Sequence, residues 1–166
     1  YGMRWVSGNV LVSEELDYIQ NYITLMNLRF DYKIILSLNI PDNVKQQKIP
    51  KMSLQPIVEN AIVHGIEEVA EDTTIYLKGY VDNKACYLEI SDSGKGMTEE
   101  QVAKLKKKIA GQIEDGGGSG NGIGLKNVQD RINIAFGPEY GIDISSKVNC
   151  YTKIIVHLPL MTEDFI

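Results

Sequence analysis

Three polar residues, Glu59, Asn60 and His64, fall on one face of a predicted helix over residues 54–65. The amide oxygen of Asn60 is a hard ligand of the kind that Mg²⁺ accepts beside water and phosphate oxygens. The Glu59 carboxylate could orient a water molecule, a metal-bound group or an attacking imidazole. Each residue also has a structural alternative, because an Asn can bond to a neighbouring loop, a Glu can form a surface salt bridge, and a His can be structural.

A further candidate, Asp92, could recognise a purine base. It follows Ile90 by two residues at the end of a predicted strand, so its carboxylate should point into the interior with the apolar side chains. An ionised carboxylate only accepts hydrogen bonds, which suits the exocyclic amine of adenine and repels the oxygen of guanine. Gly94 and Gly96 would leave room for the base, and Met97 could supply an apolar wall. In isolation, Asp-x-Gly-x-Gly more often marks a turn after a strand.

The stretch over residues 120–125 could bind phosphate. It reads Gly-Asn-Gly-Ile-Gly-Leu and opens a predicted helix, so free N–H groups and the positive end of the helix dipole could hold phosphate oxygens. The candidate residues are Gly120, Gly122, Gly124 and Leu125. Their spacing is neither that of a P-loop nor Gly-x-Gly-x-x-Gly. The alternative is a flexible linker, and the glycine-rich residues 111–123 are predicted to be mobile.

The helix that carries Glu59 and Asn60 needs a buried opposite face. Its apolar stripe consists of Leu54, Ile57, Val58, Ala61 and Ile62. Ser53 can cap this helix, Pro56 falls in the first turn where a missing N–H costs little, and Gly65 can end it. The pattern therefore predicts core contacts on one side and ligand contacts on the other.

The periodicity of the remaining chain predicts a mixed fold. Strands are expected near residues 34–40, 74–81, 85–90, 141–147 and 152–158. Further helices are expected near residues 13–30, 98–110 and 125–136. This order predicts an α/β fold of the α+β kind, a two-layer sandwich with helices packed on one face of a mixed, mostly antiparallel sheet.

Composition narrows the class of protein. The 166 residues, with 43% hydrophobic and 23% charged side chains, fit one globular domain with a sizeable core. The net charge of −5 argues against a nucleic-acid partner. No run approaches the roughly 18 apolar residues needed to cross a bilayer, so the chain as given is expected to be soluble. Cys86 and Cys150 follow no pairing pattern, which favours free thiols.

Four motifs in this order resemble those of the GHKL ATPase superfamily, which includes gyrase-like ATPases and sensor histidine kinases. Residues 54–65 resemble the N box, and their sequence is most similar to that of kinases of the YesM/LytS type. Residues 92–97, residues 120–125 and Thr152 at the start of the last strand follow at family-like separations. The resemblance implies the Bergerat ATP-binding fold, with ATP and Mg²⁺ as cofactors and residues 120–125 in the ATP lid.

The resemblance also implies roles for single residues. Asn60 would be the Mg²⁺ ligand, and Glu59 and Asn60 would act in catalysis. The residues implied to bind the cofactor are Asn60, Asp92, Gly94, Gly96, Met97, Gly120, Gly122, Gly124, Leu125 and Thr152. Arg131, on the following helix, is as consistent with a structural role as with a phosphate contact.

At the level of the whole protein, the resemblance implies the catalytic domain of a sensor kinase. Residues 1–31 would be the end of the dimerisation region and its hinge, or the helix there could lie on its own sheet, and residues 32–166 would be the ATP-binding domain. The domain would transfer the γ-phosphoryl group to a histidine on a dimerisation helix outside this chain. The implied partners are those helices, a downstream response regulator and a second copy in a homodimer. The implied location is the cytoplasmic side of a membrane-anchored kinase.

Departures from the family pattern keep two rivals open. Gyrase-like ATPases have a glutamate for water activation where this chain has Pro56, which favours a kinase over a non-kinase GHKL ATPase. Many kinases have a basic residue at the position of Val63, and glycines in place of Asn149 and Tyr151. These changes favour a degenerate interaction module, or altered loop geometry near the adenine.

Overall fold

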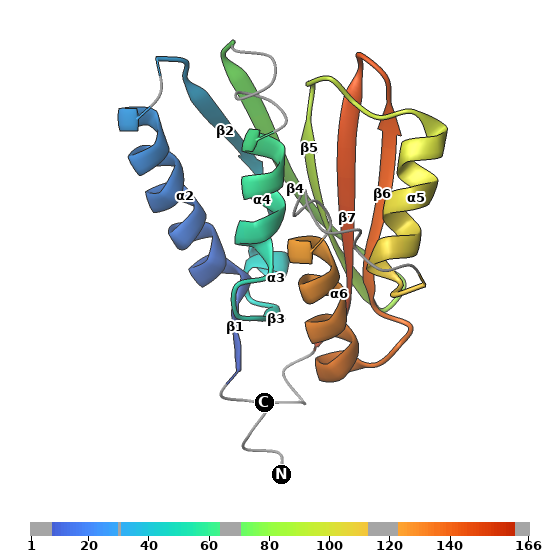
Figure 1. The fold of residues 1–166 in the computed structure, drawn as a ribbon. Helices are drawn as coiled ribbons and strands as arrows, with labels where there is room; N and C mark the ends of the chain where they lie inside the picture. The colour runs from blue at the N-terminus through green and yellow to red at the C-terminus, as the bar shows by residue number, and fades with distance from the viewer. Residues whose placement is uncertain (1–7, 30, 64–70, 113–122, 162–166) are drawn as a thin grey trace.

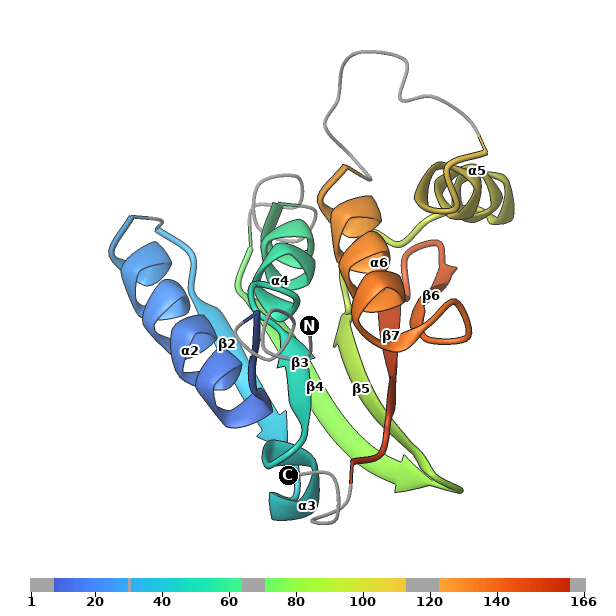
Figure 2. The same ribbon diagram turned by 90° about the horizontal axis from the view of Figure 1, so that it is seen from below.

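A five-stranded sheet forms one layer of the molecule, and helices cover one of its faces (Figures 1 and 2). The computed structural model describes residues 8–29, 31–63, 71–112 and 123–161. The strands of this sheet are β2 (Ile34–Asn39), β4 (Thr73–Asp82), β5 (Ala85–Asp92), β6 (Gly141–Lys147) and β7 (Tyr151–Pro159). Their order is β2-β4-β5-β7-β6, in which β2 and β4 are parallel and the other neighbours antiparallel. The predicted fold class is confirmed.

Three helices lie in a row on the inner face of the sheet. They are α2 (Val12–Arg29), α4 (Leu54–Ile62) and α6 (Ile123–Phe136), and α4 contacts both of the others. The helix α5 (Glu99–Ile109) packs beside the edge strand β6 and also contacts α6. None of the helices in the described ranges is long and apolar enough to cross a membrane.

Three short elements were not predicted from the sequence. The strands β1 (Asn9–Leu11) and β3 (Lys48–Pro50) pair antiparallel in a second, two-stranded sheet, and α3 (Asp42–Lys45) lies just before β3. The sequence pattern indicated no helix or strand at residues 9–11, 42–45 or 48–50. Three- and four-residue elements are too short for periodicity to reveal, and β1 and β3 are defined only by their pairing with each other across a long stretch of sequence.

The core lies between the sheet and the helices. All five apolar residues predicted to form the buried stripe of α4 are buried. In β5 the buried residues alternate as expected, since Cys86, Leu88, Ile90 and Asp92 are all at most 5% exposed. Both predicted faces of these elements are therefore confirmed.

The first helix, α2, packs on the domain's own sheet. Leu16, Ile19 and Ile23 are buried in the common core. The Asn27 side chain brackets the backbone of Ile34, donating to its carbonyl at 3.0 Å and accepting from its N–H at 2.7 Å. The helix thus lies on its own sheet. The assignment of residues 1–31 to the end of a dimerisation region stays a prediction.

The buried side chain of Gln47 ties together distant parts of the chain. Its amide donates to the carbonyl of Met161 at 3.1 Å and accepts from the Met161 N–H at 2.7 Å. The Gln47 carbonyl also accepts from Val12 N–H at 2.9 Å, and Lys51 N–H donates to Gly8 O at 2.9 Å. The N-terminal and C-terminal ends of the described chain are therefore both hydrogen-bonded to the segment that leads into α4.

The start of α5 provides a test of the local fold. Thr98 and Gln101 form a reciprocal capping box, with bonds of 2.8 and 3.1 Å. We expect Thr98→Ala to lower the free energy of unfolding by about 1 kcal/mol, because the Gln101 N–H at the helix start loses its acceptor.

A matched control is Thr24→Ala, which removes a hydroxyl that only bonds back to Gln20 O within α2. That change should leave the unfolding free energy unaltered or slightly raised, because alanine is the better helix former. Urea unfolding followed by circular dichroism measures both variants. Equal stability of the two would contradict the role of the capping box.

Candidate nucleotide-binding site

Asp92 lies where the sequence predicted, at the end of β5 and on the inner face of the sheet. Its side chain is 5% exposed, and its Oδ1 accepts a hydrogen bond of 2.9 Å from Gly94 N–H. Thr152 on β7 is its register partner, so the two residues lie side by side on neighbouring strands. The C-terminal ends of β5 and α4 point toward the same end of the molecule (Figure 1). The carboxylate therefore lies on the face of the sheet that the helices cover.

The loop after Asp92 is fastened to the β6–β7 hairpin. Gly96 has a φ of +69°, and a Cβ there would overlap the carbonyl of Lys147. Only glycine combines this backbone conformation with so close an approach. A bond of 2.7 Å from Asn149 N–H to Lys95 O holds the same two loops together. The second glycine of the Asp-x-Gly-x-Gly motif therefore shapes the loop by packing against backbone.

The hydroxyl group of Ser146 lies between this loop and the hydroxyl group of Thr152. Ser146 Oγ accepts from Met97 N–H at 2.8 Å and donates to Tyr151 O at 2.7 Å. It also lies 3.1 Å from Thr152 Oγ1. Because the Ser146 hydroxyl has a single hydrogen, Thr152 is the donor of this third bond. Ser146 was not predicted, and its partner Met97 is too far away in the sequence for any local pattern to indicate it.

Asn149 occupies a position where the family pattern has a glycine. Its φ of +59° is in the left-handed region, which asparagine tolerates better than most residues. Tyr151 begins β7 and pairs with Lys147, and its hydroxyl lies 3.1 Å from Ser145 Oγ. The hairpin therefore keeps a tight turn without the glycines.

On α4, Glu59 and Asn60 are half-buried on the face opposite the apolar stripe. Glu59 Oε1 accepts from Gln55 Nε2 at 3.1 Å, an interaction within one turn of the same helix. The predicted separation of core and polar faces is confirmed. The roles of the two residues in catalysis and metal binding stay predictions.

Pro56 lies in the first turn of α4 and close to the start of α6. A Cβ at Gly124 would lie 3.6 Å from Pro56 Cβ, so the two helices approach closely here. Leu125, the next residue, is 2% exposed and belongs to the core. Gly124 thus lies at a helix start beside α4, whereas Leu125 faces the interior. Gly120, Gly122 and His64 lie outside the described residues.

The start of α4 is not capped by Ser53, contrary to the sequence prediction. The Ser53 hydroxyl donates to Pro50 O at 2.5 Å instead. The buried Glu15 carboxylate on α2 accepts from the N–H groups at the start of α4. A signal for this was present, because Glu15 falls at core-facing spacings from Val12 and Ile19, where a charged residue needs a partner.

Arg131 also contacts the turn before α4. Its Nη1 donates to Lys51 O at 2.8 Å and to Met52 O at 3.0 Å. Of the two roles considered for this residue, the structure supports the structural one. The guanidinium joins α6 to the backbone that leads into α4.

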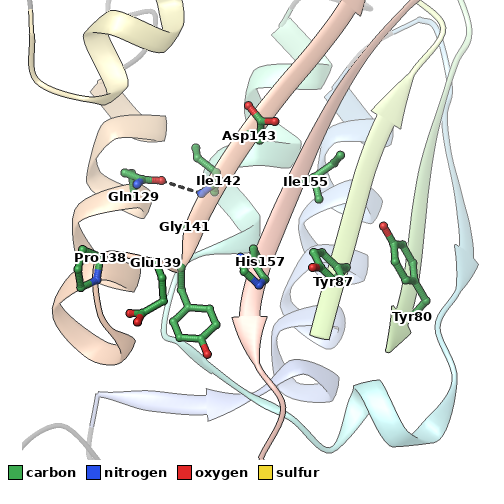
Figure 3. A pocket seen from close by; sticks show the side chains of 11 residues that line it. Tyr80, Tyr87, Gln129, Pro138, Glu139, Gly141, Ile142, Asp143, Ile155 and His157 are labelled. Atoms are coloured by element: carbon green, nitrogen blue, oxygen red, sulfur yellow. Dashed lines mark hydrogen bonds between the residues drawn. The ribbon is translucent and has the colours of Figure 1, made fainter. Parts of the chain in front are cut away.

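A pocket of about 450 Å³ lies away from this site, beside the edge strand β6 (Figure 3). An aromatic row crosses it, in which Tyr80, Tyr87 and His157 stack with ring centroids 5.1 and 4.9 Å apart. Burial, as the largest cause, and a hydrogen bond to Glu89 raise the pKa of Tyr80 to about 12, so its phenol stays protonated at neutral pH. None of the predicted site residues lines this pocket.

Both cysteines are free. Cys86 is buried in the core, and this burial raises the pKa of its thiol to about 11, whereas Cys150 is exposed in the turn between β6 and β7. A thiol with a pKa so far above neutral is almost fully protonated and therefore a poor nucleophile. Neither residue is part of the candidate site.

Comparison with known proteins decides the family. The family described as histidine kinase-, DNA gyrase B-, and HSP90-like ATPase matches residues 50–162. The chain belongs to this family. The match covers both α4 and the β5 loop, so the buried Asp92 lies within the domain that all these ATPases share.

Curated relatives of this chain include two sensor kinases. It is similar to sensor histidine kinase YesM of Bacillus subtilis, with 32% identity over 154 residues, which cover 93% of this chain and 24% of YesM. It is also similar to sensor protein kinase HptS of Staphylococcus aureus, with 31% identity over 160 residues, which cover 96% of this chain and 30% of HptS. The chain spans less than a third of the length of either relative.

Solved structures share the fold. The nucleotide-free catalytic domain of histidine kinase ThkA matches with a TM-score of 0.66 and 15% identity, covering 92% of this chain and 94% of that one. A histidine kinase domain from a blue-light activated histidine kinase of Erythrobacter litoralis matches with a TM-score of 0.60 and 12% identity, covering 91% and 62%. At these identities the likeness concerns the fold.

The tight contact at Gly96 yields a prediction. Gly96→Ala should lower the free energy of unfolding by about 1–3 kcal/mol, because the new Cβ meets the Lys147 backbone and the φ is unfavourable for alanine. Gly124→Ala is the matched control, since its Cβ would make an ordinary 3.6 Å contact in a helical turn. That control should be neutral or more stable by up to about 1 kcal/mol. Urea unfolding distinguishes the two, and a Gly96→Ala variant as stable as the control would refute the assigned contact.

Proposed function

We propose that this chain is the ATP-binding catalytic domain of a sensor histidine kinase. It transfers the γ-phosphoryl group of Mg·ATP to a histidine on a dimerisation helix outside this chain. The observation that carries the proposal is the buried carboxylate of Asp92, held on the inner face of the sheet in a chain that belongs to a family of ATPases. Such a group recognises an adenine amine through a bond that a guanine oxygen cannot make.

The residues around Asp92 are suited to hold a purine. Gly94 accommodates close approach of the base, and its N–H fixes the orientation of the Asp92 carboxylate. Met97 lies partly buried against the core and supplies an apolar wall. Thr152 lies beside Asp92 on the next strand and belongs to the same hydrogen-bonded cluster as the Met97 backbone. By this proposal, these contacts would give a flat base a fixed, partly apolar surface to lie against.

The phosphate end of the site would lie along α4 and the start of α6. Asn60 offers a neutral amide oxygen on the half-buried polar face of α4, the donor type that Mg²⁺ takes beside phosphate and water oxygens. Gly124 lies in the first turn of α6, where N–H groups lack helical partners and favour an anion. Gly120 and Gly122 would extend this contact. When bound, Mg²⁺ supplies neutralisation of the phosphate charge.

Transfer to a protein histidine is favoured over rapid hydrolysis. Pro56 occupies the position at which the gyrase-like members carry a glutamate, and proline cannot activate water. Glu59, the carboxylate nearest to Asn60 along the helix, could instead orient the attacking imidazole. The sequence contains two histidines, and one of them, His157 on β7, stacks on the ring of Tyr87 and lies against the tilted ring of Tyr140. The acceptor is therefore expected on another segment.

The named relatives support this reading, because both are sensor kinases. By the same reading the partners are the dimerisation and phosphotransfer helices, a response regulator and a second copy in the full-length homodimer. The acidic net charge of −5 gives no support to nucleic acid as a partner. The domain would act on the cytoplasmic side of a membrane-anchored kinase.

Nucleotide selectivity tests the adenine assignment. The unaltered chain should bind ATP far more tightly than GTP, and Asp92→Asn should lose most of this preference because the amide can turn a donor toward the guanine oxygen. Calorimetric titration with each nucleotide, with and without Mg²⁺, measures the ratio. Asp143→Asn, at an exposed carboxylate near α5, is the matched control and should keep the preference. Equal affinities of the unaltered chain for ATP and GTP would reject the assignment.

The reaction itself is tested by phosphoryl transfer in trans. Radiolabelled Mg·ATP and this chain should label a histidine on the dimerisation helices of the parent kinase, giving an acid-labile and base-stable product. Asn60→Ala should greatly reduce labelling without loss of cooperative unfolding, because its side chain lies outside the buried stripe. Vigorous ATP hydrolysis by the chain alone, without label on the helices, would instead identify a non-kinase ATPase. Absence of nucleotide binding would identify a degenerate interaction module.

A further inference from the structure

In the turn just before α4, the backbone N–H groups donate to one buried carboxylate, that of Glu15. Glu15 Oε1 accepts from Ser53 N–H at 2.9 Å and from Leu54 N–H at 3.0 Å, and Oε2 accepts from Met52 N–H at 3.1 Å. Glu15 belongs to α2 and is 2% exposed. A carboxylate at a helix start also gains from the partial positive charge there. The start of α4 is therefore bound to α2 by three charge-assisted hydrogen bonds.

The backbone carbonyl groups of the same turn accept hydrogen bonds from Arg131 of α6. Arg131 Nη1 donates to Lys51 O at 2.8 Å and to Met52 O at 3.0 Å. Met52 thus gives its N–H to a residue of α2 and its carbonyl to a residue of α6. The helices α2, α4 and α6 lie side by side (Figure 2), and polar contacts at this turn join them.

Met52 carries strain that these contacts maintain. Its φ of +65° is in the left-handed region, which is uncommon for a residue with a long side chain. Such a conformation persists where the surroundings over-determine it, and it is typical of functional sites. Here the surroundings are Glu15 and Arg131, which bind the two polar groups of this residue. The strain indicates that the direction of the backbone as it enters α4 is fixed by these two side chains.

Orientation at this turn determines the place of Asn60. The helix has nine residues, and Asn60 lies six residues after Leu54, which corresponds to about 9 Å along the axis. A helix this short behaves as a rigid rod on its buried face, so a tilt at the first turn displaces its far end. Asp92 lies on β5, in the sheet, and does not depend on α4 for its position.

We infer that Glu15 and Arg131 are positioning residues that set where Asn60 lies against bound Mg·ATP. This inference rests on the proposed function. Glu15 acts from the helix that precedes the sheet, and Arg131 acts from the helix that begins at the end of the predicted lid. Neither side chain touches nucleotide. Their shared effect is on the Mg²⁺-dependent part of ATP binding, whereas adenine recognition by Asp92 is independent of them.

The test separates positioning from stability by measuring ATP binding with Mg²⁺ and with EDTA. Glu15→Gln keeps the size of the side chain but turns an NH₂ group toward the N–H donors, and Arg131→Lys keeps the charge but loses the guanidinium plane. Each variant should lose roughly 10- to 100-fold in affinity for Mg·ATP, the range for residues that orient metal ligands. In EDTA each should stay within about twofold of the unaltered chain, because the contacts to adenine remain.

Two matched controls lie on the same helices. Glu14→Gln removes an exposed carboxylate that accepts only from Leu11 N–H at 3.2 Å, and Lys126→Gln removes an exposed ion pair with Asp130. Both should bind Mg·ATP as the unaltered chain does. Titrations are made well below the melting temperature of each variant, so a change in stability alone leaves the ratio of the two affinities unchanged.

Two outcomes overturn the inference. If Glu15→Gln or Arg131→Lys melts earlier but keeps its Mg·ATP affinity within about twofold, the side chain is merely structural. If Glu15→Gln does not fold, Arg131→Lys decides by the same criterion, since Arg131 lies nearer the surface. Hydrogen exchange of residues 57–63 without nucleotide is a separate readout, and exchange should be faster in both variants than in the controls. Unchanged exchange rejects the positioning role, whether or not the unaltered chain binds ATP. A lack of ATP binding by the unaltered chain is a different result, and it would reject the proposed function.

Discussion

The arrangement of the helices depends on the three hydrogen bonds between Glu15 and the start of α4. A carboxylate that is 2% exposed would cost several kcal/mol if it were left unpaired, so α2 and α4 cannot separate without a large penalty. The bonds satisfy N–H groups that a helix start always leaves without helical partners. One acidic side chain thus binds α2 to the start of the helix that carries Glu59 and Asn60.

The two faces of the sheet are used differently. The inner face carries the core and ends at Asp92, beneath α4, where the loop and the hairpin are joined through Gly96 and Ser146. The outer face carries the aromatic row, including Tyr87 and His157 (Figure 3). Because side chains alternate along a strand, a shift in register by one residue would exchange these faces. Stacking across β4, β5 and β7 on the outer face therefore also secures the position of Asp92 on the inner one.

The sequence was sufficient to predict the features that depend on local periodicity. The alternation that ends at Asp92 and the five-residue stripe of α4 were both predicted correctly, because one element contains the whole pattern. Contacts between distant segments were missed. Ser146 meets Met97 across 49 residues, and Glu15 meets Ser53 across 38, so no window of sequence contains both partners. Ser53 looked like a cap, but a carboxylate from another helix binds the N–H groups of Met52, Ser53 and Leu54 instead.

The hydrogen bonds between Gln47 and Met161 close a loop of 114 residues, and this length affects the order of folding. The entropy lost in closing so long a loop is recovered only when much of the sheet has already formed. The segment that leads into α4 is therefore expected to become ordered late, and to be the first part released when the two outer ends of the domain are pulled apart. Mechanical load on the chain would thus reach the start of α4 before it reaches the sheet.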